Sequence, residues 1–314
     1  MSLRSITDLA DGVMIDGDQQ ETLLPPDEFD FEKFNRGRQF FVQNVFSCTV
    51  AMYFSLIAGL SIPNLLNALV FTNESSTPQK SFHRYLKTFH HVASWHYNDV
   101  WDLNSAAYKS IQYVRKKHMD VRNQMHLQSH NNKIRFLSQY DMGIVQSGFV
   151  GLIILYAENF GIKCKESDLD DYVYFWYGIG HLLGIQKKYN ICAHGFHQAK
   201  RFCRDVEFDV KHRYLHDPPI EFFTLMHALI RAFNPIQWVY IFTFPVVLKL
   251  FHCLDNYKWL HISFFDYLRF YMLKLFFFIM RHSDKFKRLL NHKFEQDFHL
   301  QPQPTKTLEI EKSS

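Results

Sequence analysis

Residues 81–125 read SFHRYLKTFHHVASWHYNDVWDLNSAAYKSIQYVRKKHMDVRNQM. The rest of the chain is organised around this stretch. Apolar residues recur three and four positions apart in its first part, and they are Phe82, Tyr85, Leu86, Phe89, Val92 and Ala93. The second part repeats such a stripe in 4-3-4-3-4 steps, through Ala107, Ile111, Val114, His118, Val121 and Met125. This spacing is typical of helices buried on one face. It predicts two helices, over residues 81–95 and 106–125, joined by a short aromatic and polar link.

Each of these helices also carries polar residues that have two interpretations. Arg84, Lys87, Thr88 and His91 share a second stripe on the first helix, because residues three and four apart lie on one face. His118 lies in the middle of the apolar stripe of the second helix. These residues are either a solvated basic face and a core histidine, or side chains that meet at a ligand. Spacing alone leaves both interpretations open.

Composition favours an all-α fold with one globular multi-helix domain. The chain has 314 residues, 47% of them hydrophobic, with only 12 Gly and 10 Pro, and segments that read as strands are sparse. The five cysteines form no C-x-x-C pair, so neither a disulfide framework nor a zinc ribbon is expected. A net charge of +4 gives no indication of nucleic-acid binding. Glu-x-x-His does not occur, which disfavours a di-iron carboxylate site.

Two further apolar stretches bear on the core. Residues 45–72 carry no charge and approach the length of a membrane span, but Pro63 and several polar residues interrupt them. Two buried helices that meet near residues 61–63 are therefore preferred. Residues 139–160 predict another helix, in which Gly143, Gly148 and Gly151 would let a neighbouring helix or a flat cofactor approach closely.

The two ends of the chain differ from its centre. Residues 1–32 hold nine acids and one base, so we expect a disordered acidic arm over residues 1–30 and no secretory signal. A helical catalytic region is expected over 31–215 and a helical extension over 216–294, with a disordered tail over 295–314. An aromatic run at 263–280 precedes basic residues at 281–293, which fits either docking on an anionic membrane or another helical layer on the core.

Several short motifs, taken in order, resemble one known family. They are Phe34-x-x-Gly37, Arg84-x-x-Lys87-Thr88, Val114-Arg115-x-x-His118, Gln139-Tyr140-Asp141-Met142 and the run Gly180-His181-Leu182-Leu183-Gly184-Ile185. The set resembles the catalytic domain shared by bacterial rubber oxygenase (latex clearing protein) and the endoplasmic-reticulum-bound oxygenase of mycophenolic acid biosynthesis. The resemblance covers about residues 30–215.

This resemblance implies a helical fold around a b-type haem. His118 matches the proximal iron ligand, and Arg84, Lys87 and Thr88 match residues around the haem. The implied function is a haem b-dependent oxygenase that uses O₂ on an apolar, isoprenoid- or lipid-like substrate. The implied location is intracellular and membrane-associated, at the endoplasmic reticulum.

The chemistry of these residues agrees with such a site. A neutral imidazole is a common iron ligand, and the fork of Arg84 suits a carboxylate such as a haem propionate. Lys87 could reach the distal side only as a neutral amine, and Thr88 could donate a hydrogen bond to O₂ or to water.

The family's upstream acid has no match at its expected place. Sixteen residues before Arg84 stands Ala68, and Glu74 is nearer but in an expected loop. The general base therefore stays unidentified. The alternative functions are a non-catalytic haem-binding protein or a membrane-associated helical protein.

Overall fold

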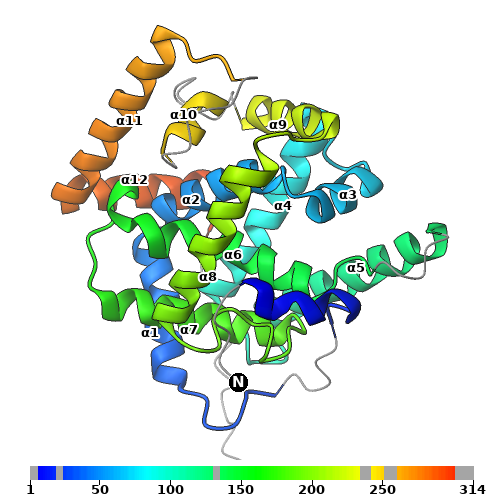
Figure 1. The fold of residues 1–314 in the computed structure, drawn as a ribbon. Helices are drawn as coiled ribbons and strands as arrows, with labels where there is room; N and C mark the ends of the chain where they lie inside the picture. Colours follow the sequence, from blue (N-terminus) through cyan, green and yellow to red (C-terminus); the bar gives the residue numbers. More distant parts are fainter. Residues whose placement is uncertain (1–5, 19–23, 130–134, 234–241, 251–259, 301–314) are drawn as a thin grey trace, which may run out of the picture.

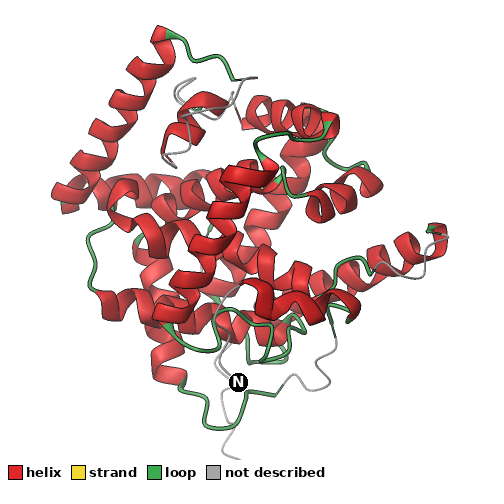
Figure 2. Ribbon diagram, viewed as in Figure 1, coloured by secondary structure: helices red, strands yellow, loops and turns green. Residues whose placement is uncertain are grey.

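The computed structural model describes residues 6–18, 24–129, 135–233, 242–250 and 260–300, and these residues form helices without any β-strand (Figures 1 and 2). The α-helices are α1 (Phe31–Gln43), α2 (Val45–Gly59), α3 (Pro63–Thr72), α4 (Pro78–Tyr97), α5 (Ala106–Gln128), α6 (Gln139–Tyr156), α7 (Glu166–Leu182), α8 (Phe196–Asp209), α9 (Ile220–Phe233), α10 (Phe244–Leu250), α11 (Phe264–His282) and α12 (Asp284–Asp297). Short 3-10 or π segments are η1 (Ile6–Met14), η2 (Ala157–Phe160) and η3 (Val210–Tyr214). The predicted all-α class is confirmed.

Local sequence explains where the principal helices begin. α4 starts at a proline in its first turn, and the Thr77 hydroxyl accepts the backbone N–H of Lys80 at 3.3 Å. α5 is capped in the same way by Ser105, whose hydroxyl accepts from the backbone N–H of Tyr108 at 2.9 Å. Residues 45–72 form the two expected helices, α2 and α3, which meet at residues 60–62.

α6 lies at the centre of the packing and contacts α2, α7, α8 and η1. By length and composition, Gln139–Phe160 could cross a membrane, and so could the bent pair α1 and α2 if it formed one span. Most of the apolar window of Gln139–Phe160 is buried inside the protein, as in the central helix of a soluble domain. Gly143 fits the expected close approach, because a Cβ there would lie 2.9 Å from the carbonyl oxygen of Tyr189. Gly148 does not, since a Cβ there would meet nothing within 4 Å.

Another glycine sets the crossing of α1 and α7. A Cβ at Gly37 would overlap the carbonyl oxygen of Asp171, so only glycine allows the two helices to approach this closely. α4 in turn packs against both α5 and α9. The helices together enclose one continuous hydrophobic core.

The C-terminal helices belong to this same core. α9 packs on α4, and α12 packs on α2. The Asn291 amide of α12 also donates to the carbonyl oxygen of Gln43, the last residue of α1, at 2.7 Å. Phe46 of α2 contacts the rings of Phe276 and Phe294. The boundary between residues 215 and 216 stays a prediction, but helices on both sides of it share one core. The predicted disordered tail over 295–314 is described only to residue 300: α12 ends at Asp297, within this stretch, and Leu300 is buried.

The N-terminal segment departs from the expected disordered arm. η1 lies against α6, and Leu9 is fully buried. Asp18 pairs with the buried Arg122 at 2.6 Å, and Asp11 pairs with Lys188. Acidic residues that look solvated in the sequence are thus matched by bases more than 100 positions away. Residues 1–5 and 19–23 of the predicted arm lie outside the described part of the chain.

Candidate active site

The structure brings the four predicted site residues to one cavity. Its volume is about 880 Å³, and its lining is dominated by aliphatic and aromatic side chains. Arg84, Lys87 and Thr88 reach it from α4, and His118 reaches it from α5. The two helices lie side by side, so residues thirty positions apart in sequence share one space.

His118 has a largely enclosed ring. Its Nδ1 is buried and has no hydrogen-bond partner among the described residues. Burial, followed by the positive charge of Arg84 and then of Lys117, lowers the pKa of His118 to about 4. The ring is therefore neutral at physiological pH, with one nitrogen that no described residue pairs.

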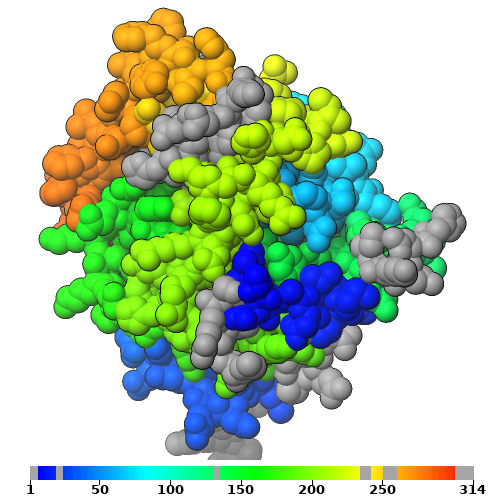
Figure 3. Space-filling model, in the orientation of Figure 1, coloured from blue at the N-terminus to red at the C-terminus, as the bar shows by residue number. Residues whose placement is uncertain are grey.

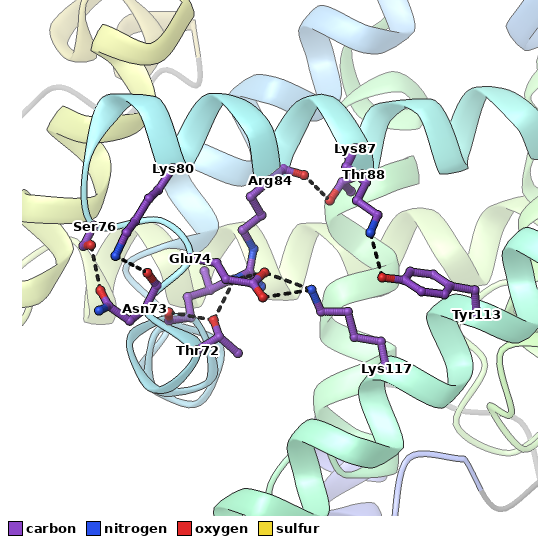
Figure 4. A network of polar contacts seen from close by, with 11 residues as sticks. Thr72, Asn73, Glu74, Ser76, Lys80, Arg84, Lys87, Thr88, Tyr113 and Lys117 are labelled. Carbon is purple, nitrogen blue, oxygen red and sulfur yellow. Dashed lines mark hydrogen bonds and ion pairs between the residues drawn. The ribbon is translucent and has the colours of Figure 1, made fainter.

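A polar network occupies one side of the cavity, between the loop that precedes α4 and α5 (Figure 4). Arg84 donates from Nη1 to the Thr72 hydroxyl at 2.7 Å and lies 3.7 Å from a carboxylate oxygen of Glu74. Lys117 donates to both carboxylate oxygens of Glu74, at 2.9 and 3.1 Å. Two cations from two helices thus meet one carboxylate that lines the same cavity as His118.

Glu74 is the functional candidate that the sequence did not single out. Burial favours a higher pKa for this carboxyl, but the hydrogen bond from Lys117 and the charges of Lys117 and Arg84 outweigh it, so the pKa lies below its ordinary value. Asn73 caps α3 in a left-handed conformation, with φ of 50°, and thereby turns the chain toward α4. In the sequence, only the Asn73-Glu74 pair after an apolar helix could have pointed to this residue. Its proximity to Lys117 depends on the tertiary fold and is not visible in the sequence.

Lys87 and Thr88 lie on the exposed side of the cavity. The Lys87 ammonium donates to the Tyr113 hydroxyl at 2.7 Å and lies 4.5 Å from the centre of that ring. The Thr88 hydroxyl donates to the carbonyl oxygen of Arg84, one turn earlier, at 3.1 Å. In this arrangement, Thr88 is engaged within α4 and Lys87 is engaged with α5.

His91 also lines the cavity. Its Nδ1 lies 2.7 Å from the Ser110 hydroxyl, while its Nε2 is buried without a hydrogen-bond partner among the described residues. Burial, and then the charge of Lys87, lowers the pKa of His91. Within the described ranges, no group of three or more His, Cys, Asp and Glu side chains could by itself hold a metal ion.

Residues 43–206 match the family described as ER-bound oxygenase mpaB/B'/rubber oxygenase, catalytic domain. The chain belongs to this family. The match covers just over half of the chain and includes the cavity residues from α4 and α5 together with Glu74. Comparison with curated proteins and with solved structures found no match. Membership of this oxygenase family supports an enzymatic role, and the predicted resemblance to the family is confirmed over residues 43–206.

Proposed function

We propose that this member of the oxygenase family is a haem b-dependent oxygenase that acts on an apolar substrate. The observation that carries the proposal is the neutral ring of His118, which lines a large apolar cavity and whose buried Nδ1 has no hydrogen-bond partner among the described residues. An unpaired buried polar atom costs about 1–3 kcal/mol. A partner for this atom is therefore expected, and an iron ion held in haem would be one.

The other residues of the cavity fit such a group. The cavity volume of about 880 Å³ is within the range of ligand and cofactor sites. Gly148 lines the cavity, and a Cβ there would stand in open space. His118 would hold the iron, and the cationic Arg84 and Lys117 would offset the charge of the haem carboxylates. Haem, when bound, supplies the activation of O₂.

The chain's own residues would then position the substrate and move protons. Thr72 and Glu74 orient the Arg84 guanidinium, which is held by a 2.7 Å hydrogen bond and a 3.7 Å ion pair. Glu74 is ionised at neutral pH, because its pKa is lowered, so it can accept a proton at a carboxylate oxygen. We assign to it the role of the general base that the sequence left open.

The apolar lining supports an apolar class of substrate. Side chains such as Leu65, Leu69, Phe149 and Leu152 line the cavity and offer no hydrogen bonds. An isoprenoid- or lipid-like chain would bury its surface there without leaving polar groups unpaired. The description of the family includes an ER-bound oxygenase, which supports placing the protein at the membrane of the endoplasmic reticulum.

The decisive experiment is the optical spectrum of the full chain purified from haem-supplied cells. We expect a Soret band and about one haem per chain by the pyridine haemochrome method, and loss or displacement of the band in His118→Ala. His126→Ala is the matched control, because His126 lies on the same helix but does not line the cavity. An unchanged spectrum in His118→Ala would remove this histidine from the site.

A second measurement separates an oxygenase from a non-catalytic haem-binding protein. With a reductant and a prenyl or fatty substrate, the oxygenase consumes O₂ in proportion to the oxidised product. A haem-loaded protein that forms no product from either class of substrate would favour the non-catalytic alternative.

A further inference from the structure

One strip of the surface is unusually apolar. Of the exposed large hydrophobic side chains among the described residues, nine lie on α11, and they are Phe264, Phe265, Tyr267, Leu268, Tyr271, Met272, Leu275, Phe278 and Ile279. Side chains of this size, each about half exposed, present on the order of 800 Å² together, above the few hundred Å² that are usual on a monomer. α11 forms an outer edge of the molecule, coloured orange in Figures 1 and 3. We call these nine side chains the α11 strip.

The opposite face of α11 attaches this helix to the domain. Phe270, Leu273, Phe277 and Met280 are buried in the core. Gly161, at φ of +74°, allows the close contact, since a Cβ there would lie 2.8 Å from that of Met280. Arg281 pairs with Glu158 at 2.5 Å. The strip is therefore presented on a fixed helix that has apolar residues on both of its faces.

The charges around the strip are mostly positive. Lys274 of α11 is exposed, and so are Lys285 and Arg288 at the start of α12. Asp266 is enclosed, and its oxygens accept from Ser263, Thr243 and Arg269. Between residues 260 and 290, the only exposed carboxylate is that of Asp284. An aromatic strip with a basic border matches the headgroup region of an anionic bilayer.

We propose that the α11 strip docks the protein on the surface of an anionic lipid bilayer. α11 carries charges along its length and is not among the helices apolar enough to span, so it would lie in the plane of the interface. A second copy of the chain is the less suitable partner, because two basic borders would repel each other. The proposal concerns the surface alone and does not depend on the cofactor.

The cavity is connected to this surface. Leu273 and Phe276 of α11 line it, and so do Leu289 and Lys293 of α12. Leu289 and Lys293 are also exposed, so the cavity reaches the surface beside α12. If the proposed function holds, an apolar substrate would pass from the bilayer into the cavity along α12.

Flotation of the full chain with vesicles tests the docking. We expect binding to phosphatidylcholine vesicles that contain phosphatidylserine, weaker binding to phosphatidylcholine alone, and a decrease with added salt. Leu268→Glu with Leu275→Glu should lower the affinity at least about tenfold, since both residues would enter the interface. The matched control is Leu103→Glu with Leu127→Glu, because these leucines are 64% and 85% exposed, against 49% and 59% for the α11 pair. Reversing Lys274, Lys285 and Arg288 to Glu should remove the preference for anionic vesicles.

Three results would overturn the proposal. One is no binding of the unaltered chain to either kind of vesicle. Another is an equal loss of vesicle affinity in the control variant, Leu103→Glu with Leu127→Glu. The third is a dimer in sedimentation experiments that becomes a monomer in the variant Leu268→Glu with Leu275→Glu, while this variant still binds vesicles as the unaltered chain does. Failure of the proposed function would be distinguishable, because His118→Ala should keep vesicle binding and the α11 pair should keep the optical spectrum of the unaltered chain.

Discussion

Lys117 holds the carboxylate of Glu74 at 2.9 Å, and it is the residue directly before His118 on α5. One turn of helix therefore presents both the proposed iron ligand and the cation that fixes the proposed base. Arg84 approaches the same carboxylate at 3.7 Å from α4. A single substitution at Glu74 consequently alters the charge of the site without touching His118.

Glu74→Gln should leave haem content unchanged and lower the rate of product formation by about 100-fold or more, because an amide cannot accept the proton. Glu158→Gln is the control, since Glu158 also pairs with an arginine but lies outside the cavity. The pKa of Glu74 is lowered, so the fall in rate that its protonation causes at acidic pH should occur below the ordinary pKa of a glutamate. A rate that is unaffected in Glu74→Gln would exclude this residue as the base.

Gly148 and Gly143 form a matched pair of probes on α6. Gly148→Leu places its side chain in the cavity, so we expect loss of haem binding with an unchanged or higher melting temperature. Gly143→Leu should instead destabilise the fold, because its Cβ would lie 2.9 Å from the carbonyl oxygen of Tyr189. Haem titration and thermal melts of both variants measure the difference. Equal haem affinity in Gly148→Leu and the unaltered chain would contradict a haem at this helix.

His96 makes the stability of the fold depend on pH. Burial lowers its pKa to about 3, against about 6.5 in the unfolded chain, and its ring stacks on Phe41 at 3.6 Å between centres. Between these values the unfolded chain binds the additional proton, so the free energy of unfolding falls as the pH falls from 6.5 toward 3. His96→Phe keeps a stacking ring and removes this titration. Urea unfolding at several pH values should give a slope that is shallower by up to about 1.4 kcal/mol per pH unit.

The N-terminal segment should contribute to stability. Leu9 is fully buried against the domain, so Leu9→Ala should lower the free energy of unfolding by about 2–5 kcal/mol. Met14→Ala, at a side chain that is 53% exposed, should change it by about 0.5 kcal/mol or less. Denaturant titration measures both values. Equal free energies of unfolding for the two variants would contradict a contribution of η1 packing to stability.

The sequence predicts the helices better than it predicts their partners. Apolar spacing places the predicted segments 81–95 and 106–125 within α4 and α5, because that spacing and the caps at Thr77 and Ser105 are local properties. The ion pair between Asp18 and Arg122 spans more than 100 residues, so no local pattern indicates it. For this reason the packing of the N-terminal segment on the domain could not be predicted from the sequence.

The residues of the candidate site also differ in how far the sequence predicts their place. Helical stripes and the family motif both mark Arg84 and His118, which line one cavity, and their roles stay predictions. The hydrogen bond from Thr88 to Arg84 is local, yet it competes with the predicted donation to a ligand and depends on a rotamer that the sequence does not specify. Glu74 was passed over because a loop has no periodic face.

The cavity has a consequence for the life of the protein in a cell. Atoms that line a space of about 880 Å³ lack neighbours on one side and lose the corresponding dispersion contacts. Any molecule that fills this space binds the folded chain and not the unfolded one, and so shifts the folding equilibrium toward the native state. Unfilled chains are the better substrates for proteases. At a given rate of synthesis, the steady-state amount of the protein should therefore rise with the supply of the occupant.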